Sequence, residues 1–218
     1  LAEQLKILEK NQNLVVWSEG EVINTIGAPT GQTFTQMHKA ADKKKEGRIF
    51  EELIKGNFIL CSSFMAARRN VNGLRFSPKL KYMNYWLFFT ELAKGRDFYF
   101  IKEPLIKYRI HENSTNKDTT GYLKDTIMLN RIFIQKFSRI LSKQMLSSIY
   151  FTNGILYEKH DQKFNAYLSI ATSLLVNPMN EDARYYFSKL LKQHYPTFYA
   201  TARNFWLCLK QQAVKRIK

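Results

Sequence analysis

Short apolar runs and turn-forming segments alternate along the first half of the chain, a pattern typical of helices and strands that follow one another. Apolar residues at helical spacing predict a helix over residues 1–12. β-Branched and aromatic residues then predict a strand over 14–24. The segment 25–32 contains glycine, proline and glycine, and it predicts a turn.

The region that follows has apolar runs of both helical and extended character. A polar, charged surface segment over 35–48 comes first. We then expect a short helix over 49–57, a buried strand over 58–69, a helix over 84–95, and two strands over 96–101 and 105–111 that Glu103-Pro104 separates. This half of the chain therefore predicts a mixed α/β sheet with helices.

Beyond the polar loop at 111–120 the pattern is helical throughout. We expect helices over 122–142, 144–159, 163–175, 180–193 and 197–217. The stretch 165–193 pairs two helices across Asn177-Pro178 and is similar to one tetratricopeptide repeat, with an ordinary helical hairpin as the alternative. The expected organisation is an α/β domain over 1–118 followed by an all-α domain over 119–218.

Composition adds a strong positive charge to this picture. The net charge is +16, and residues 123–218 hold 15 Lys and Arg against 5 Asp and Glu. Such a field attracts nucleic acid, anionic lipid headgroups or phosphorylated substrates. The sequence contains no recognisable nucleic-acid-binding motif, so we expect no nucleic acid partner. Cys61 and Cys208 lie far apart, which favours a reducing, cytoplasmic setting over a disulfide framework.

Three stretches occur in an order that points to one enzyme family: "KILEKN" at 6–11, "GNFILCSSFMAARR" at 56–69 and "FYFIKEPLIKYRIHENSTN" at 98–116. Together they resemble the second half of family 2 glycosyltransferases, inverting enzymes of the GT-A fold, over residues 1–118. The resemblance implies transfer of a sugar from a nucleotide-sugar donor to a hydroxyl of a glycan or lipid-linked acceptor, in polysaccharide biosynthesis. It also implies a divalent cation, Mg²⁺ or Mn²⁺, as cofactor.

The resemblance further implies a donor-binding half that comes before this region. In the family that half ends with an Asp-x-Asp motif, which holds the metal. No Asp-x-Asp occurs in this sequence. We therefore expect the chain to be the acceptor-side half of such an enzyme, lacking its N-terminal donor-binding half and inactive alone.

The resemblance also assigns candidate site residues. Arg109 and His111 would bind the diphosphate of the donor, with His111 also approaching the metal, because residues two apart on a strand face the same side. The alternative is a surface arginine and a loop histidine. Asn57, Ser62 and Ser63 would line the acceptor pocket; alternatively, the serines satisfy backbone groups in a buried strand.

The catalytic base of the family is an acidic pair at the start of the helix over 84–95. An ungapped count places that pair on Asn84 and Tyr85, and a shift of one residue places it on Met83 and Asn84. Neither alignment supplies an acid; asparagine is no general base, and tyrosine has a pKa of about 10. The rival hypothesis is therefore a degenerate, non-catalytic glycosyltransferase-like module that binds a partner or a membrane surface.

The last expected helix is basic and amphipathic. Over 197–218, aromatic and aliphatic residues follow helical spacing while most Lys and Arg lie off that face. Such a helix can lie on an anionic membrane surface, which predicts a cytoplasmic protein that is peripheral at the inner membrane face. The alternative is that this apolar face packs on the other helices.

Overall fold

The computed structural model describes residues 1–111, 118–197 and 199–200. The chain forms two compact units, the first ending at Leu129 and the second beginning at Asn130. This boundary falls inside helix α6 (Thr119–Phe137), whereas the sequence places it before that helix. The first part of α6 therefore belongs to the α/β unit, and the coarse order predicted from the sequence, a mixed α/β part followed by helices, is confirmed.

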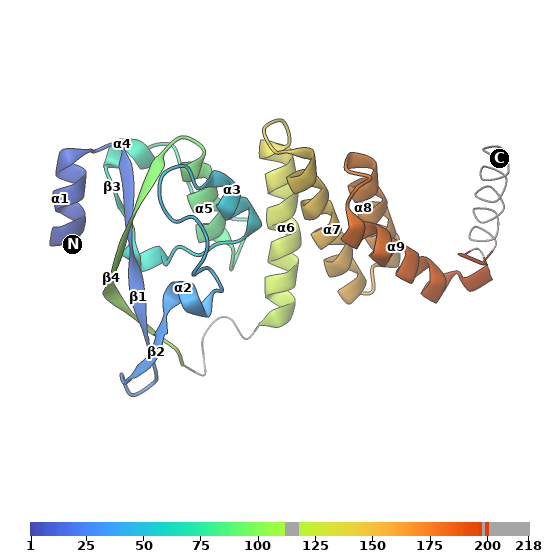
Figure 1. Ribbon diagram of the computed structural model, residues 1–218, viewed down its shortest axis with the longest axis horizontal. Coiled ribbons are helices and arrows are strands. Elements are labelled where there is room, and N and C mark those ends of the chain that lie inside the picture. Colours follow the sequence, from blue (N-terminus) through green and yellow to red (C-terminus); the bar gives the residue numbers. More distant parts are fainter. Residues whose placement is uncertain (112–117, 198, 201–218) are drawn as a thin grey trace, which may run out of the picture. The chain divides into compact units, whose positions relative to one another are not determined.

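A mixed sheet organises the first unit. Its central strand β1 (Leu14–Ile23) pairs in parallel with β4 (Asp97–Arg109) along its whole length. β2 (Pro29–Thr33) and β3 (Met65–Ala66) pair with β1 antiparallel. Because a strand has only two edges, β2 and β3 share the edge opposite β4, each pairing with a different end of β1 (Figure 1).

Helices cover both faces of this sheet (Figure 1). On one face Val15 and Trp17 pack with residues of α3 (Phe50–Lys55) and α5 (Asn84–Ala93) in the main core. On the other face Val16 packs with Leu8 of α1 (Ala2–Lys10) and with Ile101. Burial on both faces explains why β1 begins with a run of consecutive apolar residues, Leu14 to Trp17, rather than an alternating pattern.

Two segments fold differently from the expectation. The stretch 58–69, predicted as one buried strand, forms a 3₁₀ turn η1 (Cys61–Ser63), the two-residue β3, and the start of α4 (Arg68–Val71). The prediction is wrong because polar side chains bond the main chain here. Ser63 Oγ donates to the Leu60 carbonyl, and Asn70 Nδ2 donates to the Gln12 carbonyl. The Ser63 bond is local and competes with a strand ladder, whereas the Asn70 bond ties the start of α4 to the segment before β1.

The other difference concerns the hairpin after β1. The segment 25–32 was predicted as a turn, but its second half is strand β2. Asn24 Oδ1 accepts hydrogen bonds from the amides of Ile26 and Ala28, and Gly27 adopts a φ of 90°. These features confine the turn to a few residues, and the chain returns directly onto the edge of β1.

The two expected strands around Glu103-Pro104 form the single strand β4. Its register against β1 shifts between Ser18 and Gly20, so that Glu19 pairs with Pro104. Irregularities of this kind accommodate extra residues and a proline without ending the pairing. The proline therefore marks a bulge rather than a strand boundary.

The second unit is a helical array that contains α7 (Lys143–Lys159), α8 (Lys163–Val176) and α9 (Glu181–His194), as predicted. α7 and α8 approach closely where Gly154 lies against Ile170. A buried polar cluster of Ser147, Ser173 and Asn180 ties α7, α8 and the start of α9 together. Among the helices of the described ranges, none is long and apolar enough to cross a membrane. The predicted membrane-binding segment 197–218 and Cys208 lie largely or wholly outside those ranges.

Candidate functional site: an aromatic cavity in the α/β unit

The α/β unit contains a cavity of about 390 Å³. Segments far apart in the sequence contribute to it, from α2 (Phe34–Met37) to the first turn of α6. Five of its lining side chains are aromatic: Phe34, Tyr85, Trp86, Tyr108 and Tyr122. Pockets with aromatic walls and a few polar groups are the usual form of small-ligand sites.

A buried carboxylate fixes α2 at one side of this cavity. Glu19 lies in β1 and is only 5% exposed. Its Oε1 accepts hydrogen bonds from the amides of Gly20 (2.9 Å) and Thr35 (3.1 Å), and its Oε2 accepts from Thr35 Oγ1 (2.5 Å). A capping box between Thr33 and Gln36 closes the same helix start. These bonds place Phe34 and His38 in the cavity wall.

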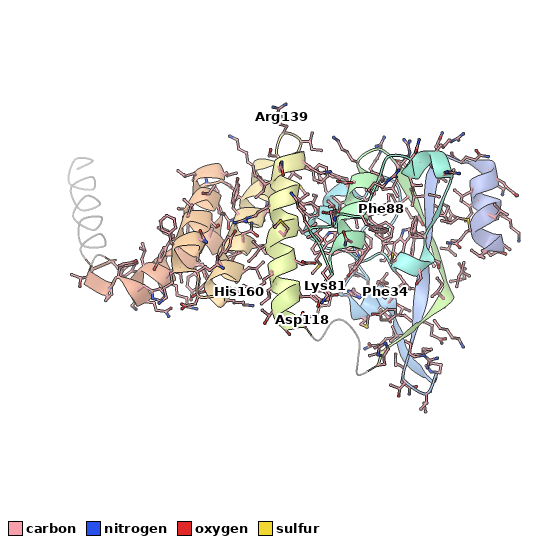
Figure 2. The ribbon with its side chains drawn as sticks, turned by 180° about the vertical axis from the view of Figure 1, so that it is seen from behind. Phe34, Lys81, Phe88, Asp118, Arg139 and His160 are labelled. Carbon is pink, nitrogen blue, oxygen red and sulfur yellow. The ribbon has the colours of Figure 1, made fainter. Side chains whose placement is uncertain are left out.

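The aromatic side chains of this wall contact one another. His38 stacks on Phe34 with a ring separation of 4.3 Å, and Phe34, labelled in Figure 2, meets the ring of Tyr108 edge-on at 5.1 Å. Burial lowers the pKa of His38 below 6.5, because desolvation disfavours the charged imidazolium. His38 therefore presents a neutral imidazole to the cavity at neutral pH.

Two tyrosines form the opposite side. Tyr85 and Tyr122 both line the cavity, and their phenols interact. Burial first, and then this interaction with Tyr122, raise the pKa of Tyr85 far above 10. The Tyr85 hydroxyl therefore stays protonated at any physiological pH, and it can serve as a hydrogen-bonding group but not as a base.

The first turns of α6 are anchored to the loop before α5. Asp125 Oδ2 accepts hydrogen bonds from the amides of Lys81 (2.7 Å), Tyr82 (2.5 Å) and Met83 (3.2 Å). The Tyr82 hydroxyl donates to Asp118 Oδ2 (2.6 Å), and this bond lowers the pKa of Asp118. Figure 2 labels Lys81 and Asp118 at this anchor. The anchor holds Tyr122, which stacks on Tyr82 at 4.9 Å, in the cavity wall.

Of the predicted acceptor residues, only Asn57 lines the cavity. Its side chain is bound to the main chain of Ile59, with Nδ2 donating to the carbonyl at 3.0 Å and Oδ1 accepting from the amide at 3.4 Å. Ser62 is exposed, and Ser63 is buried with its Oγ bonded to the Leu60 carbonyl. Neither serine lines the cavity, whereas their neighbour Cys61 does, with burial raising the pKa of its thiol.

The two positions of the expected acidic pair have different surroundings. Tyr85 lines the cavity, but Asn84 does not. The half-buried Asn84 uses Nδ2 to donate to the Leu80 carbonyl, one turn before α5. The asparagine therefore holds the start of the helix in place.

Arg109 and His111, the predicted diphosphate ligands, do not line the cavity. Arg109 Nη1 donates to the carbonyls of Asn24 (3.2 Å) and Thr25 (2.8 Å) in the β1–β2 turn. Because side chains alternate along a strand, Arg109 faces away from the side on which Tyr108 lines the cavity. His111 is exposed and lies two residues beyond the end of β4. The structure thus brings together Asn57 and Tyr85, but not Arg109 and His111.

The sequence analysis missed several cavity residues for identifiable reasons. Tyr108 belongs to the same alternating run as Arg109, but the family resemblance assigns roles only to Arg109 and His111 on the charged side of that strand. His38 has no metal-ligand spacing to other residues, and Glu19 lies within a segment whose neighbours predict a strand. A buried carboxylate inside a strand is itself a signal, because an ionised group is rarely buried without hydrogen-bond partners.

A divalent cation finds no ready set of ligands in the part of the chain that the structure describes. No group of three or more His, Cys, Asp or Glu side chains converges there. We therefore assign no described residue as a ligand of the expected divalent cation. Comparison with family models, curated proteins and solved structures found no match to this chain.

Proposed function

We propose that this chain is the acceptor-side half of a GT-A glycosyltransferase similar to family 2, and that the aromatic cavity binds the sugar acceptor. The observation that carries this proposal is the convergence of Asn57 and Tyr85 on one cavity with aromatic walls. The family resemblance assigns Asn57 to the acceptor pocket and Tyr85 to one position of the acidic pair. The parallel pairing of β1 with β4, with helices on both faces, supports the same proposal.

The lining residues suit a sugar ring. One face of a pyranose carries mainly C–H groups, and such a face packs well on the electron-rich face of an aromatic ring. Trp86 and Tyr108 offer such rings from α5 and β4. The hydroxyls of Tyr85 and Tyr122 can exchange hydrogen bonds with sugar hydroxyls, which fixes the orientation of the ring.

The rival proposal, a degenerate module that binds a glycan without transferring it, has an observation in its favour. Asn84 has no carboxyl group, and its Nδ2 donates to the Leu80 carbonyl. Tyr85 keeps its proton because burial raises its pKa. The nearby Asp125 has its Oδ2 bound by three backbone amides. Of these three residues only Tyr85 lines the cavity, where it can orient a ligand, but proton removal from an acceptor hydroxyl requires an available base.

Carbohydrate binding tests what the two proposals share. We expect saturable binding of an oligosaccharide to this chain by isothermal titration calorimetry. Tyr108→Ala should weaken that binding about tenfold, which corresponds to the loss of about 1.4 kcal/mol of contact. The matched control is Tyr99→Ala, because Tyr99 lies on the same strand, is 40% exposed and lies away from the cavity. Equal effects of the two substitutions, or no binding, would refute the cavity as a sugar site.

Turnover separates the two proposals. The complete polypeptide that contains this chain is incubated with nucleotide sugars and acceptor, with and without Mn²⁺ or Mg²⁺. Release of nucleoside diphosphate that depends on both acceptor and metal supports the enzyme. Glycan binding without turnover supports the non-catalytic module.

A further inference from the structure

Helix α8 carries large apolar side chains on its exposed face as well as apolar residues on its buried face. Ala166, Ile170 and Ser173 form its buried face within the helical unit. The opposite face carries Phe164 (78% exposed) and Leu175 (83% exposed). Between Phe164 and Val176 the helix contains no charged residue. Large apolar side chains that are exposed together on one face of a helix mark an interaction surface, so we look for a partner that covers this face of α8.

The exposed face has the spacing of a helix-packing seam. Phe164, Leu168, Ala171 and Leu175 follow one another at intervals of four, three and four residues. These intervals keep all four side chains on one stripe of the helix. Leu168 is 56% exposed, and Ala171 is half-buried. The stripe therefore presents three large side chains and one small one to a partner.

The stripe is complementary to itself when a second copy runs antiparallel. If the two-fold axis passes midway between Leu168 and Ala171, each Leu168 faces Ala171 of the other copy, so a large residue meets a small one. In the same register each Phe164 faces Leu175 of the other copy, at both ends of the seam. A two-fold interface needs this kind of self-complementarity, because the same patch serves both subunits.

We propose that α8 forms an antiparallel, two-fold interface between two copies of this chain. Lys163 then lies at the C-terminal end of the partner's α8, where the helix dipole favours a positive charge. The stripe has no Lys or Arg alongside it, unlike helices that lie on anionic membranes. These features favour a second copy over a lipid surface.

The available area is at the lower limit of a specific interface. Phe164, Leu168, Leu175 and the neighbouring Met179 (74% exposed) are the large apolar side chains concerned. At ~150–200 Å² for a large side chain, their exposed parts amount to on the order of 500 Å² per copy. A pair then buries on the order of 1,000 Å², which fits a weak dimer in the micromolar range.

Sedimentation velocity over a concentration series tests the association. We expect a monomer–dimer equilibrium that Leu168→Glu weakens at least about tenfold, because two glutamates would be buried near the axis. The matched control is Leu5→Glu, since Leu5 is 51% exposed on α1 and should leave the equilibrium unchanged. Added salt should strengthen the wild-type dimer, because each chain carries a net charge of +16.

Cysteine cross-linking tests the register, in chains whose Cys61 and Cys208 are replaced by serine. A mixture of Phe164→Cys and Leu175→Cys chains should form a disulfide-linked pair under mild oxidation. Phe164→Cys alone should not, because eleven residues of helix separate it from its own copy by about 16 Å along the seam.

Each outcome decides the proposal. A dimer that is lost in Leu168→Glu and that cross-links only in the mixture supports it. A monomer at all concentrations overturns it and assigns the stripe to another occupant, such as the chain's own C-terminal segment. A dimer that survives Leu168→Glu, or that cross-links equally in Phe164→Cys alone, also overturns it. Circular dichroism of every variant separates these outcomes from loss of the fold.

Discussion

We expect removal of the Glu19 carboxylate to disturb the cavity wall, although Glu19 itself does not line the cavity. Its carboxylate lies in the sheet, 5% exposed, and accepts three hydrogen bonds that hold the start of α2. Two of the three donors belong to Thr35 and one to Gly20. Glu19→Ala leaves the amide and hydroxyl of Thr35 without this acceptor in a buried setting.

The expected cost follows from these donors. An unsatisfied buried donor costs about 1–3 kcal/mol, and part of this is recovered where water enters the space left by the side chain. We therefore expect Glu19→Ala to lower the free energy of unfolding by about 3–4 kcal/mol, a large share of a typical total. Glu19→Gln keeps the shape and one acceptor oxygen, so its cost should be about 1–2 kcal/mol.

Urea denaturation followed by circular dichroism measures both values. Glu46→Ala is a suitable control because Glu46 is an exposed glutamate outside this bonding network. Glycan binding by the folded fraction of Glu19→Ala should also weaken, since Phe34 and His38 depend on α2. A loss below about 1 kcal/mol for Glu19→Ala, or equal losses for Ala and Gln, would refute the reasoning.

Three further predictions concern other parts of the molecule. Burial lowers the pKa of His38 from 6.5, so neutral His38 contributes stability that is full above about pH 6.5 and is lost as the pH falls through the lowered pKa. Thermal denaturation at a series of pH values should show this loss, and His38→Phe should reduce it. Gly154→Ala should cost about 1–2 kcal/mol, because the added methyl meets the γ carbon of Ile170, and combining it with Ile170→Ala, which removes that carbon, should cost less than the sum of the two single losses; simple additivity in a double-mutant cycle would contradict this contact. Asp125→Ala should cost about 2 kcal/mol by leaving the amides of residues 81–83 without their acceptor, whereas Lys124→Ala, at an exposed position, should be nearly neutral in the same denaturation assay.

The regular elements were predictable where one periodicity dominated. α1, β1, α5, α7, α8 and α9 were expected close to their observed bounds. The prediction of a strand over 58–69 was wrong because the apolar residues there have no periodicity. Hydrogen bonds from the side chains of Ser63 and Asn70 to the main chain fix the conformation of this segment instead. β2 was missed because its residues are exposed, and only the edge of β1 makes them a strand.

The site was predictable only in part. Family resemblance drew attention to Asn57 and Tyr85, which do line one cavity. The side of the strand on which Tyr108 lies depends on the register of β4, including its bulge opposite Glu19. No local pattern encodes that register, because it arises from pairing between residues some eighty positions apart.

The sequence alone determined that an α/β part precedes a helical part, since helical and extended segments differ in the period of their apolar residues. It also determined that the expected base positions carry Asn84 and Tyr85 rather than acids. Only the tertiary structure decided that the first part of α6 belongs to the α/β unit, that Glu19 positions α2, and that Arg109 bonds a turn instead of facing the cavity. These facts depend on contacts between distant segments, and packing energy rather than local propensity selects such contacts.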